Sequence, residues 1–479
     1  MKRKNVITIM VDQLKATALN LYGNTFCKTP ALEKLARNGV VYENAFTPHP
    51  LCVPARTSLW TSQYSHSHGI TNNEELMSSR NRHAFHIWKE AGYHTALIGK
   101  NHCFPESELK YFDTWCEIEH EGFPNGVKTK GMDWVRPINA VEKAHTVRKN
   151  MPRLSPRIEC AVTNYPINDY STALVSQQTI EFLKRVQNES FSLWLSIPDP
   201  HNPYEVHKKY VENFPKEEII LPPWDSRELE NKPERNKVLY EMLGIDKEDE
   251  ADIYKVLRVY YGMVRFIDDE IGKILEALKL YNLIQDTIIV FCSDHGDFVG
   301  EHRMMGKGGL FYDCLTHVPL IISCPSIMPQ GISDKSMVSL IDIVPTLLYL
   351  QELEIPKSMQ GKLLPTVTNA EPRSEVFAEY GSGGPPFTYK DLKKFAKPYG
   401  RHTIKETLKW REAEGRRKMI RTKEWKYVTD PMGDKDELYN LVTDPWELNN
   451  VAALHENKDI IASLTKRLLE WSIMTESIY

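Results

Sequence analysis

Residues 287–295 read TIIVFCSDH, an apolar, β-branched run that leads directly into Ser293, Asp294 and His295. A short, continuous apolar run of this kind is typical of a strand buried on both faces of a parallel sheet. Further runs of this composition occur at Val6–Val11, Thr95–Ile98, Phe191–Ile197 and Val318–Ile322. Helical signals lie between them, so the alternation predicts an α/β fold with a large, mainly parallel sheet flanked by helices.

Helix signals are clearest after Thr29, where a threonine cap precedes proline at the first helical position of TPALEKLA. Residues Ile180–Val186 and Val256–Tyr281 also predict helices. Each of these stretches lies between two predicted strands, as a crossover connection requires.

The pattern of predicted strands and helices changes after Pro365. Ser374–Tyr380 predicts a strand, Met419–Thr429 alternates like one antiparallel strand, and Ile460–Trp471 predicts a helix. We therefore expect a large α/β domain at residues 1–370 and a smaller α+β domain with a small antiparallel sheet at residues 371–479.

Polar, titratable residues follow four of the predicted strands. They are Asp12 and Gln13, Lys100 and His102, Asp199 and His201, and Asp294 and His295. In open α/β sheets, ligands bind beyond the carboxyl ends of the strands. The sequence therefore predicts one site at this edge of the sheet.

Bulk properties exclude several classes of protein. The formal net charge of −4 gives no basic excess for nucleic acid. No stretch reaches the about 20 apolar residues of a membrane span, and the first apolar run ends at Asp12, too early for a signal peptide. The eight cysteines are scattered, which suits reduced thiols. We expect a cytoplasmic protein that binds neither nucleic acid nor membrane, and nothing here indicates its oligomeric state.

Cys52, Pro54 and Arg56 form a C-x-P-x-R pattern, which on its own is most often a loop with a buried cysteine. The surrounding segments change this interpretation. They are TPALEKLARNGVVYENAF (29–46), CVPARTSLWTSQYSHSHGI (52–70), GYHTALIGKNH (92–102), Pro198–Tyr204, DHGDFVGEHRMMGKGG (294–309), HVPLII (317–322), WKY (425–427) and ELYNLVTDPWELNN (437–450). In this order, across nearly the whole chain, they resemble the formylglycine-dependent sulfatases of the alkaline phosphatase superfamily.

The resemblance implies a sulfatase fold and oxidation of Cys52 to formylglycine by a maturase. The hydrated aldehyde offers two hydroxyl groups, of which one attacks sulfur and the other expels sulfate, so a difficult reaction is split into two easier steps. Val53 and Ser62 depart from the usual family residues.

A metal site is implied at Asp12, Gln13, Cys52, Asp294 and His295. Carboxylate and amide oxygens suit Ca²⁺ or Mg²⁺, with Ca²⁺ expected first. Gln13 and His295 replace the Asp and Asn of many family members, and the imidazole leaves Mn²⁺ open.

Cationic residues at family positions complete the implied site. Arg56 and Lys100 would hold the formylglycine hydrate, and Lys307 and His201 would contact the sulfate and the bridging oxygen. His102 is implied as the base that acts on the hydroxyl expelling sulfate. Asn73 either touches the substrate or caps a turn.

We therefore expect metal-dependent hydrolysis of a small sulfate monoester, with a sulfated carbohydrate as substrate. One alternative is a phosphonate or phosphate ester hydrolase of the same superfamily. The other is a non-catalytic protein that binds sulfo ligands with unmodified Cys52.

Overall fold

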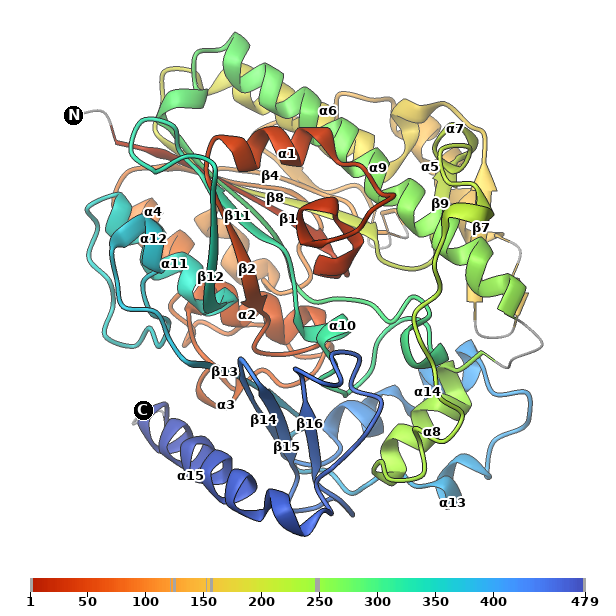
Figure 1. Ribbon diagram of the computed structural model, residues 1–479. Helices are drawn as coiled ribbons and strands as arrows, with labels where there is room; N and C mark the ends of the chain where they lie inside the picture. Colours follow the sequence, from red (N-terminus) through yellow and green to blue (C-terminus); the bar gives the residue numbers. More distant parts are fainter. Residues whose placement is uncertain are drawn as a thin grey trace.

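A large sheet forms the centre of the molecule (Figure 1). The computed structural model describes residues 3–120, 122–123, 126–151, 153–155, 158–245 and 250–476. Among these residues, nine strands form the sheet in the order β12-β2-β11-β10-β1-β8-β3-β4-β5. The bounds are β1 Asn5–Asp12, β2 Val40–Phe46, β3 His94–Gly99, β4 Thr114–Glu117, β5 Thr129–Lys130, β8 Phe191–Pro200, β10 Thr287–Ser293, β11 Leu320–Ser323 and β12 Ile332–Ser339.

Helices cover both faces of this sheet (Figure 1). The α-helices are α1 Pro30–Arg37, α2 Cys52–Thr61, α3 Ser65–His68, α4 Ala84–Glu90, α5 Ile138–Lys149, α6 Ser171–Arg185, α7 Lys208–Val211, α8 Glu234–Leu243, α9 Glu250–Leu280, α10 Asp313–Thr316, α11 Ile343–Leu350 and α12 Pro365–Thr368. A small sheet of β6 Arg153–Ser155, β7 Ile158–Thr163 and β9 Tyr204–His207 lies beside α9. Within the described ranges, no helix has both the length and the apolar character needed to cross a bilayer.

The central strands run parallel, as expected. Strand β1 pairs in parallel with β10 and β8, and β3 pairs in parallel with β8 and β4. The expectation for Val318–Ile322 was wrong, because β11 pairs antiparallel with β10 and with β2. A strand buried on both faces has the same apolar composition in either direction, so composition does not reveal its direction.

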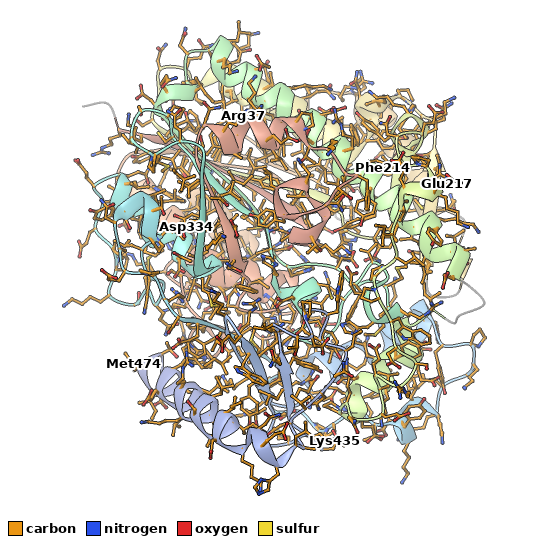
Figure 2. The ribbon with its side chains drawn as sticks, viewed as in Figure 1. Arg37, Phe214, Glu217, Asp334, Lys435 and Met474 are labelled. Atoms are coloured by element: carbon orange, nitrogen blue, oxygen red, sulfur yellow. The ribbon has the colours of Figure 1, made fainter. Side chains whose placement is uncertain are left out.

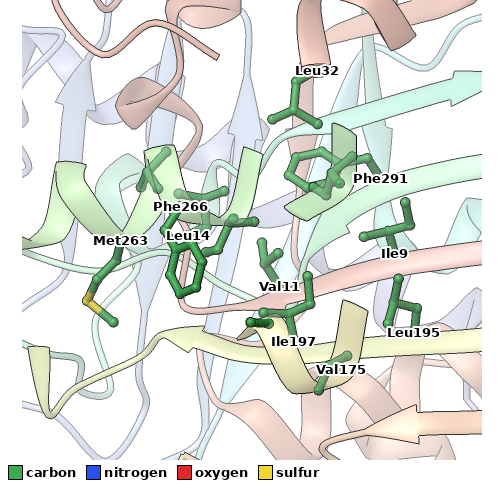
Figure 3. Packing of buried hydrophobic residues seen from close by; sticks show 14 of the residues in the cluster. Ile9, Val11, Leu14, Leu32, Val175, Leu195, Ile197, Met263, Phe266 and Phe291 are labelled. Carbon is green, nitrogen blue, oxygen red and sulfur yellow. The ribbon is translucent and has the colours of Figure 1, made fainter. Parts of the chain in front are cut away.

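Alternate side chains of β1 enter two different cores. Ile9 and Val11 pack on the α1, α6 and α9 side, as Figure 3 shows, whereas Val6 and Met10 belong to the core on the α2, α4 and α11 side. This follows from the period of two along a strand. Both faces are buried, which fits a run that is apolar at every position except Thr8.

Helix α1 begins after Thr29, as predicted, but the predicted threonine cap does not form. The Thr29 hydroxyl group donates to Asn20, and no side-chain cap bond is present at this position. Instead, the carboxylate of Asp268 on α9 accepts the backbone N–H groups of Ala31 at 3.1 Å and Leu32 at 2.8 Å. The first-turn donors are thus satisfied by a distant carboxylate.

The carboxyl-terminal part contains an antiparallel sheet in the order β13-β14-β15-β16. The bounds are β13 Glu375–Tyr380, α13 Tyr389–Leu392, α14 Arg401–Ala413, β14 Arg417–Thr422, β15 Trp425–Thr429, β16 Glu437–Asn440 and α15 Lys458–Met474. Met419–Thr429, expected as one strand, is mostly a hairpin of β14 and β15. Met474 at the end of α15 is 85% exposed (Figure 2). The domain boundary near residue 371 stays a prediction.

Candidate active site

The ends of β1 and β10 bring Asp12 and Asp294 together. In the parallel register, Val11 lies opposite Ser293, so the residues that follow reach the same edge of the sheet. Gln13 adopts a positive φ of 68°, and its backbone N–H donates to Asp294 Oδ1 at 3.0 Å. This sharp turn after the strand orients both side chains toward one site.

Cys52 is the first residue of α2 and is buried. Its Sγ lies 3.7 Å from Asp12 Oδ1, 3.1 Å from His295 Nε2 and 2.7 Å from Lys307 Nζ. The pKa of the Cys52 thiol is raised to about 11, by burial first and then by the Asp12 carboxylate, against the opposing effect of Lys307. An unmodified side chain here is therefore a protonated thiol at neutral pH.

A candidate metal site includes Cys52. One ligand atom each from Asp12, Cys52, Asp294 and His295 lies within 4.8 Å of all the others. The His295 Nδ1 atom is 2.8 Å from the carbonyl oxygen of Gly296, so an Nδ1–H donor leaves the Nε2 lone pair available as a ligand.

The side-chain amide of Gln13 tests, independently of the other ligands, whether these residues fit a metal ion. Its Oε1 atom is buried without a hydrogen-bond partner among the described residues, while its Nε2 donates to Asp297 Oδ2 at 2.7 Å. A buried carbonyl oxygen without a donor is costly unless something else satisfies it. The donor set of carboxylate, amide and imidazole groups therefore fits a divalent cation.

Arg56 connects the two carboxylates of this site. Its Nη2 donates to Asp12 Oδ2 at 3.1 Å and its Nε to Asp294 Oδ2 at 2.8 Å, and all three side chains are fully buried. Lys100 Nζ also donates to Asp12 Oδ2. Burial alone would raise the pKa of Asp12, but Lys100, His201 and Arg56 outweigh it and hold the pKa well below its usual value. Asp12 is therefore a carboxylate throughout the neutral range.

Two histidines face this cluster of charges. His102 adopts a positive φ of 60° three residues after the end of β3, and its buried Nδ1 has no partner within the described part of the chain. Burial and then Lys100 lower the pKa of His102 well below its usual value. For His201, burial and then Lys307 lower the pKa. Both imidazoles are therefore neutral at pH 7.

Asn73 is occupied by contacts within the protein. Its Oδ1 accepts the backbone N–H of Val53 at 3.1 Å, and its Nδ2 donates to Glu412 Oε1 at 3.0 Å. Of the two roles that the sequence left open, this geometry favours capping. The role in substrate binding stays a prediction.

Two residues of the site, His120 and Glu412, carried no readable sequence signal. His120, in the loop after β4, stacks on His201 with ring centroids 4.4 Å apart, and Glu412 reaches Asn73 from α14. Asp297 is buried and accepts bonds from Gln13 and from the Tyr204 hydroxyl group at 2.9 Å. Asp297 did have a sequence signal, since it lies two residues after His295, and this position indicates a residue beside the metal ligands and not one of them.

Comparison with known proteins gives the family. The sulfatase family model matches residues 4–352, and the model of the N-sulphoglucosamine sulphohydrolase carboxyl-terminal region matches residues 300–406. The chain therefore belongs to the sulfatase family. It is a sulfuric ester hydrolase.

Individual relatives resemble the chain over its full length. An arylsulfatase of Clostridium perfringens is 28% identical over 98% of this chain and 94% of its own length. A structure solved in complex with its substrate D-glucosamine-2-N,6-O-disulfate has a TM-score of 0.74 at 20% identity, covering 99% of this chain and 98% of its own. A phosphonate monoester hydrolase of Agrobacterium radiobacter has a TM-score of 0.77 at 23% identity, covering 99% and 96%. These structures establish the shared fold.

Proposed function

We propose that the chain hydrolyses the sulfate monoester of a sulfated carbohydrate, with formylglycine derived from Cys52 and one divalent cation, Ca²⁺ before Mg²⁺ or Mn²⁺. The observation that carries this proposal is the position of Cys52 against Asp12, His295 and Lys307. Because burial keeps the thiol protonated, an unmodified Cys52 would be a poor nucleophile. A formylglycine hydrate would supply a hydroxyl nucleophile, and a formylglycine-generating maturase is the partner that this requires.

The charged side chains have separate proposed tasks. Arg56 and Lys100 orient the hydrate, and their charges are balanced by the buried carboxylate of Asp12. Lys307 and His201 contact the sulfate and the bridging oxygen, where fixed donors stabilise charge that develops in the transition state. His102 accepts a proton, a role that suits a neutral imidazole.

The proposed cation would be held by the ligand atoms of Asp12, Gln13, Asp294 and His295 and by the group that replaces the Cys52 thiol. When bound, it would polarise a sulfate oxygen and favour ionisation of the attacking hydroxyl.

Sulfated sugars are expected to be better substrates than aryl or choline sulfates. The proposal is supported by the similarity to a structure that holds a disulfated glucosamine and by the match to the N-sulphoglucosamine sulphohydrolase model. The test is kcat/KM for a panel of sulfated mono- and disaccharides against nitrophenyl sulfate and choline sulfate. A clear preference for either non-sugar ester would contradict the carbohydrate assignment and leave the sulfatase activity standing.

The alternative is a phosphonate ester hydrolase, which the similarity to the Agrobacterium enzyme favours. Lys100 and His102 distinguish a sulfatase from a phosphonate hydrolase. They add a cation and a proton acceptor at the place where a covalent sulfate adduct must break down. We expect a nitrophenyl sulfate to be hydrolysed with higher kcat/KM than the matching phosphonate or phosphate ester. Lys100→Ala and His102→Ala should each lower sulfate turnover by roughly 10²–10⁴-fold.

Lys89→Ala is the control for this comparison, since Lys89 is a half-exposed lysine on α4 that pairs with Asp113. It should leave all three ester activities unchanged. A wild-type preference for the phosphonate, or variants of Lys100 and His102 that lose nothing on sulfate, would favour the alternative.

A further inference from the structure

We propose that Glu412 is a positioning residue for the reaction: from the carboxyl-terminal domain it holds Asn73, and through Asn73 it sets the backbone beside Cys52. This inference rests on the proposed function of Cys52 as the precursor of the nucleophile. Glu412 lies near the end of α14.

The start of α2 lacks a cap of its own. Leu51 occupies the cap position and makes no side-chain bond to the helix, so the first-turn N–H groups need other partners. Asn73 provides one, because its Oδ1 accepts the backbone N–H of Val53 at 3.1 Å. Val53 directly follows Cys52, and this bond therefore anchors the backbone next to the reacting side chain.

Asn73 is in turn held by two bonds to one carboxylate. Its backbone N–H donates to Glu412 Oε2 at 3.0 Å, and its Nδ2 donates to Glu412 Oε1 at 3.0 Å. These bonds determine which amide atom faces Val53, since Nδ2 is directed to Glu412 and Oδ1 is left as the acceptor. Without the carboxylate, the Asn73 side chain could rotate and the Val53 N–H would lose its acceptor.

Glu412 is 1% exposed, so water does not replace it readily. Burial raises the pKa of this carboxyl group, while the Asn73 donors, Arg411 and Lys307 oppose the shift. The route from Glu412 to the backbone beside Cys52 is therefore a buried one that runs through Asn73.

The expected consequence is a loss of turnover rather than of binding. Displacement of a reacting group by about 1 Å costs on the order of 100-fold in rate. We expect Glu412→Ala to lower kcat by ~10–100-fold with KM changed by less than about threefold. Glu412→Gln keeps one acceptor for Asn73 and should recover part of that loss.

The decisive measurement is a double-mutant cycle on nitrophenyl sulfate, with kcat normalised to the formylglycine content found by mass spectrometry. If Glu412 acts through Asn73, Glu412→Ala combined with Asn73→Ala should be little worse than the more damaging single variant. Additive losses, a loss confined to KM, or a glutamine variant no better than alanine would overturn the proposal.

Hydrogen exchange gives a readout that does not depend on activity. The peptide that contains Val53 should exchange faster in Glu412→Gln than in the wild type. Unchanged exchange would contradict the chain of contacts from Glu412 through Asn73 to Val53, even in a preparation without aldehyde.

The two proposals can fail separately. If the wild type turns over only a phosphonate ester, the proposed sulfatase function fails. The double-mutant cycle of Glu412 and Asn73, measured on that ester, still tests the role of Glu412.

Glu406→Ala is the matched control on the same helix. Glu406 is half-exposed and pairs with His402 at 3.0 Å, away from Asn73. This variant should leave kcat, KM and the exchange of α2 unchanged.

Discussion

Cys52→Ala is expected to lower kcat/KM for a sulfate monoester by on the order of 10⁴–10⁶-fold, the scale found when a covalent nucleophile is removed. The reason is geometric, because Cys52 Sγ is the atom on which His295 Nε2 at 3.1 Å and Lys307 Nζ at 2.7 Å converge. Alanine leaves these groups in place without an atom to form the covalent bond. Cys52→Ser should keep the fold and stall turnover, since a serine adduct has no second hydroxyl to expel sulfate.

The measurement pairs kinetics with mass spectrometry of the peptide that contains Cys52. Wild-type protein expressed with a maturase should carry an aldehyde there, detectable by its mass and by hydrazide capture. Cys27→Ser serves as a control, because Cys27 is a buried cysteine in the core against α9 and lies outside the candidate site. Fully active enzyme that contains only the free Cys52 thiol would refute the formylglycine mechanism.

Asp12→Asn and Asp294→Asn are expected to lower turnover by roughly 10³-fold or more, because each change removes a charge that serves several groups at once. Both carboxylates are proposed metal ligands, and both also balance the buried guanidinium group of Arg56 at 3.1 and 2.8 Å. An uncompensated buried charge costs about 3–5 kcal/mol of stability. The variants should therefore lose bound metal and also melt at lower temperature.

Metal content by elemental analysis separates these two effects. Asp342→Asn is the control, since Asp342 is a buried carboxylate that pairs with Arg373 away from Cys52. It should lose stability and keep its metal. Chelation of the wild type should abolish activity, and Ca²⁺, Mg²⁺ or Mn²⁺ should restore it. Full activity in metal-free protein would rule out the proposed cation.

The limits of sequence inference are clearest at β11 and at the β14–β15 hairpin. For Val318–Ile322 the sequence predicted burial correctly, but the strand runs antiparallel to β10. In Met419–Thr429 the alternation was correctly assigned to antiparallel structure, yet Lys423 and Glu424 form the turn between two strands. Burial and periodicity are local properties of a sequence, whereas strand direction and pairing depend on the path of the whole chain.

The sequence by itself determined the α/β class, the family resemblance and the groups at the strand ends. Parallel neighbours necessarily deliver the residues after their carboxyl ends to one edge, so Asp12 and Asp294 could be placed together from local patterns alone. Only the tertiary structure decided that Arg56 bridges these two carboxylates, that His120 stacks on His201, and that Glu412 holds Asn73 from 339 residues away. Such contacts arise where separate elements pack against each other, and the local sequence around each residue carries no record of its partner.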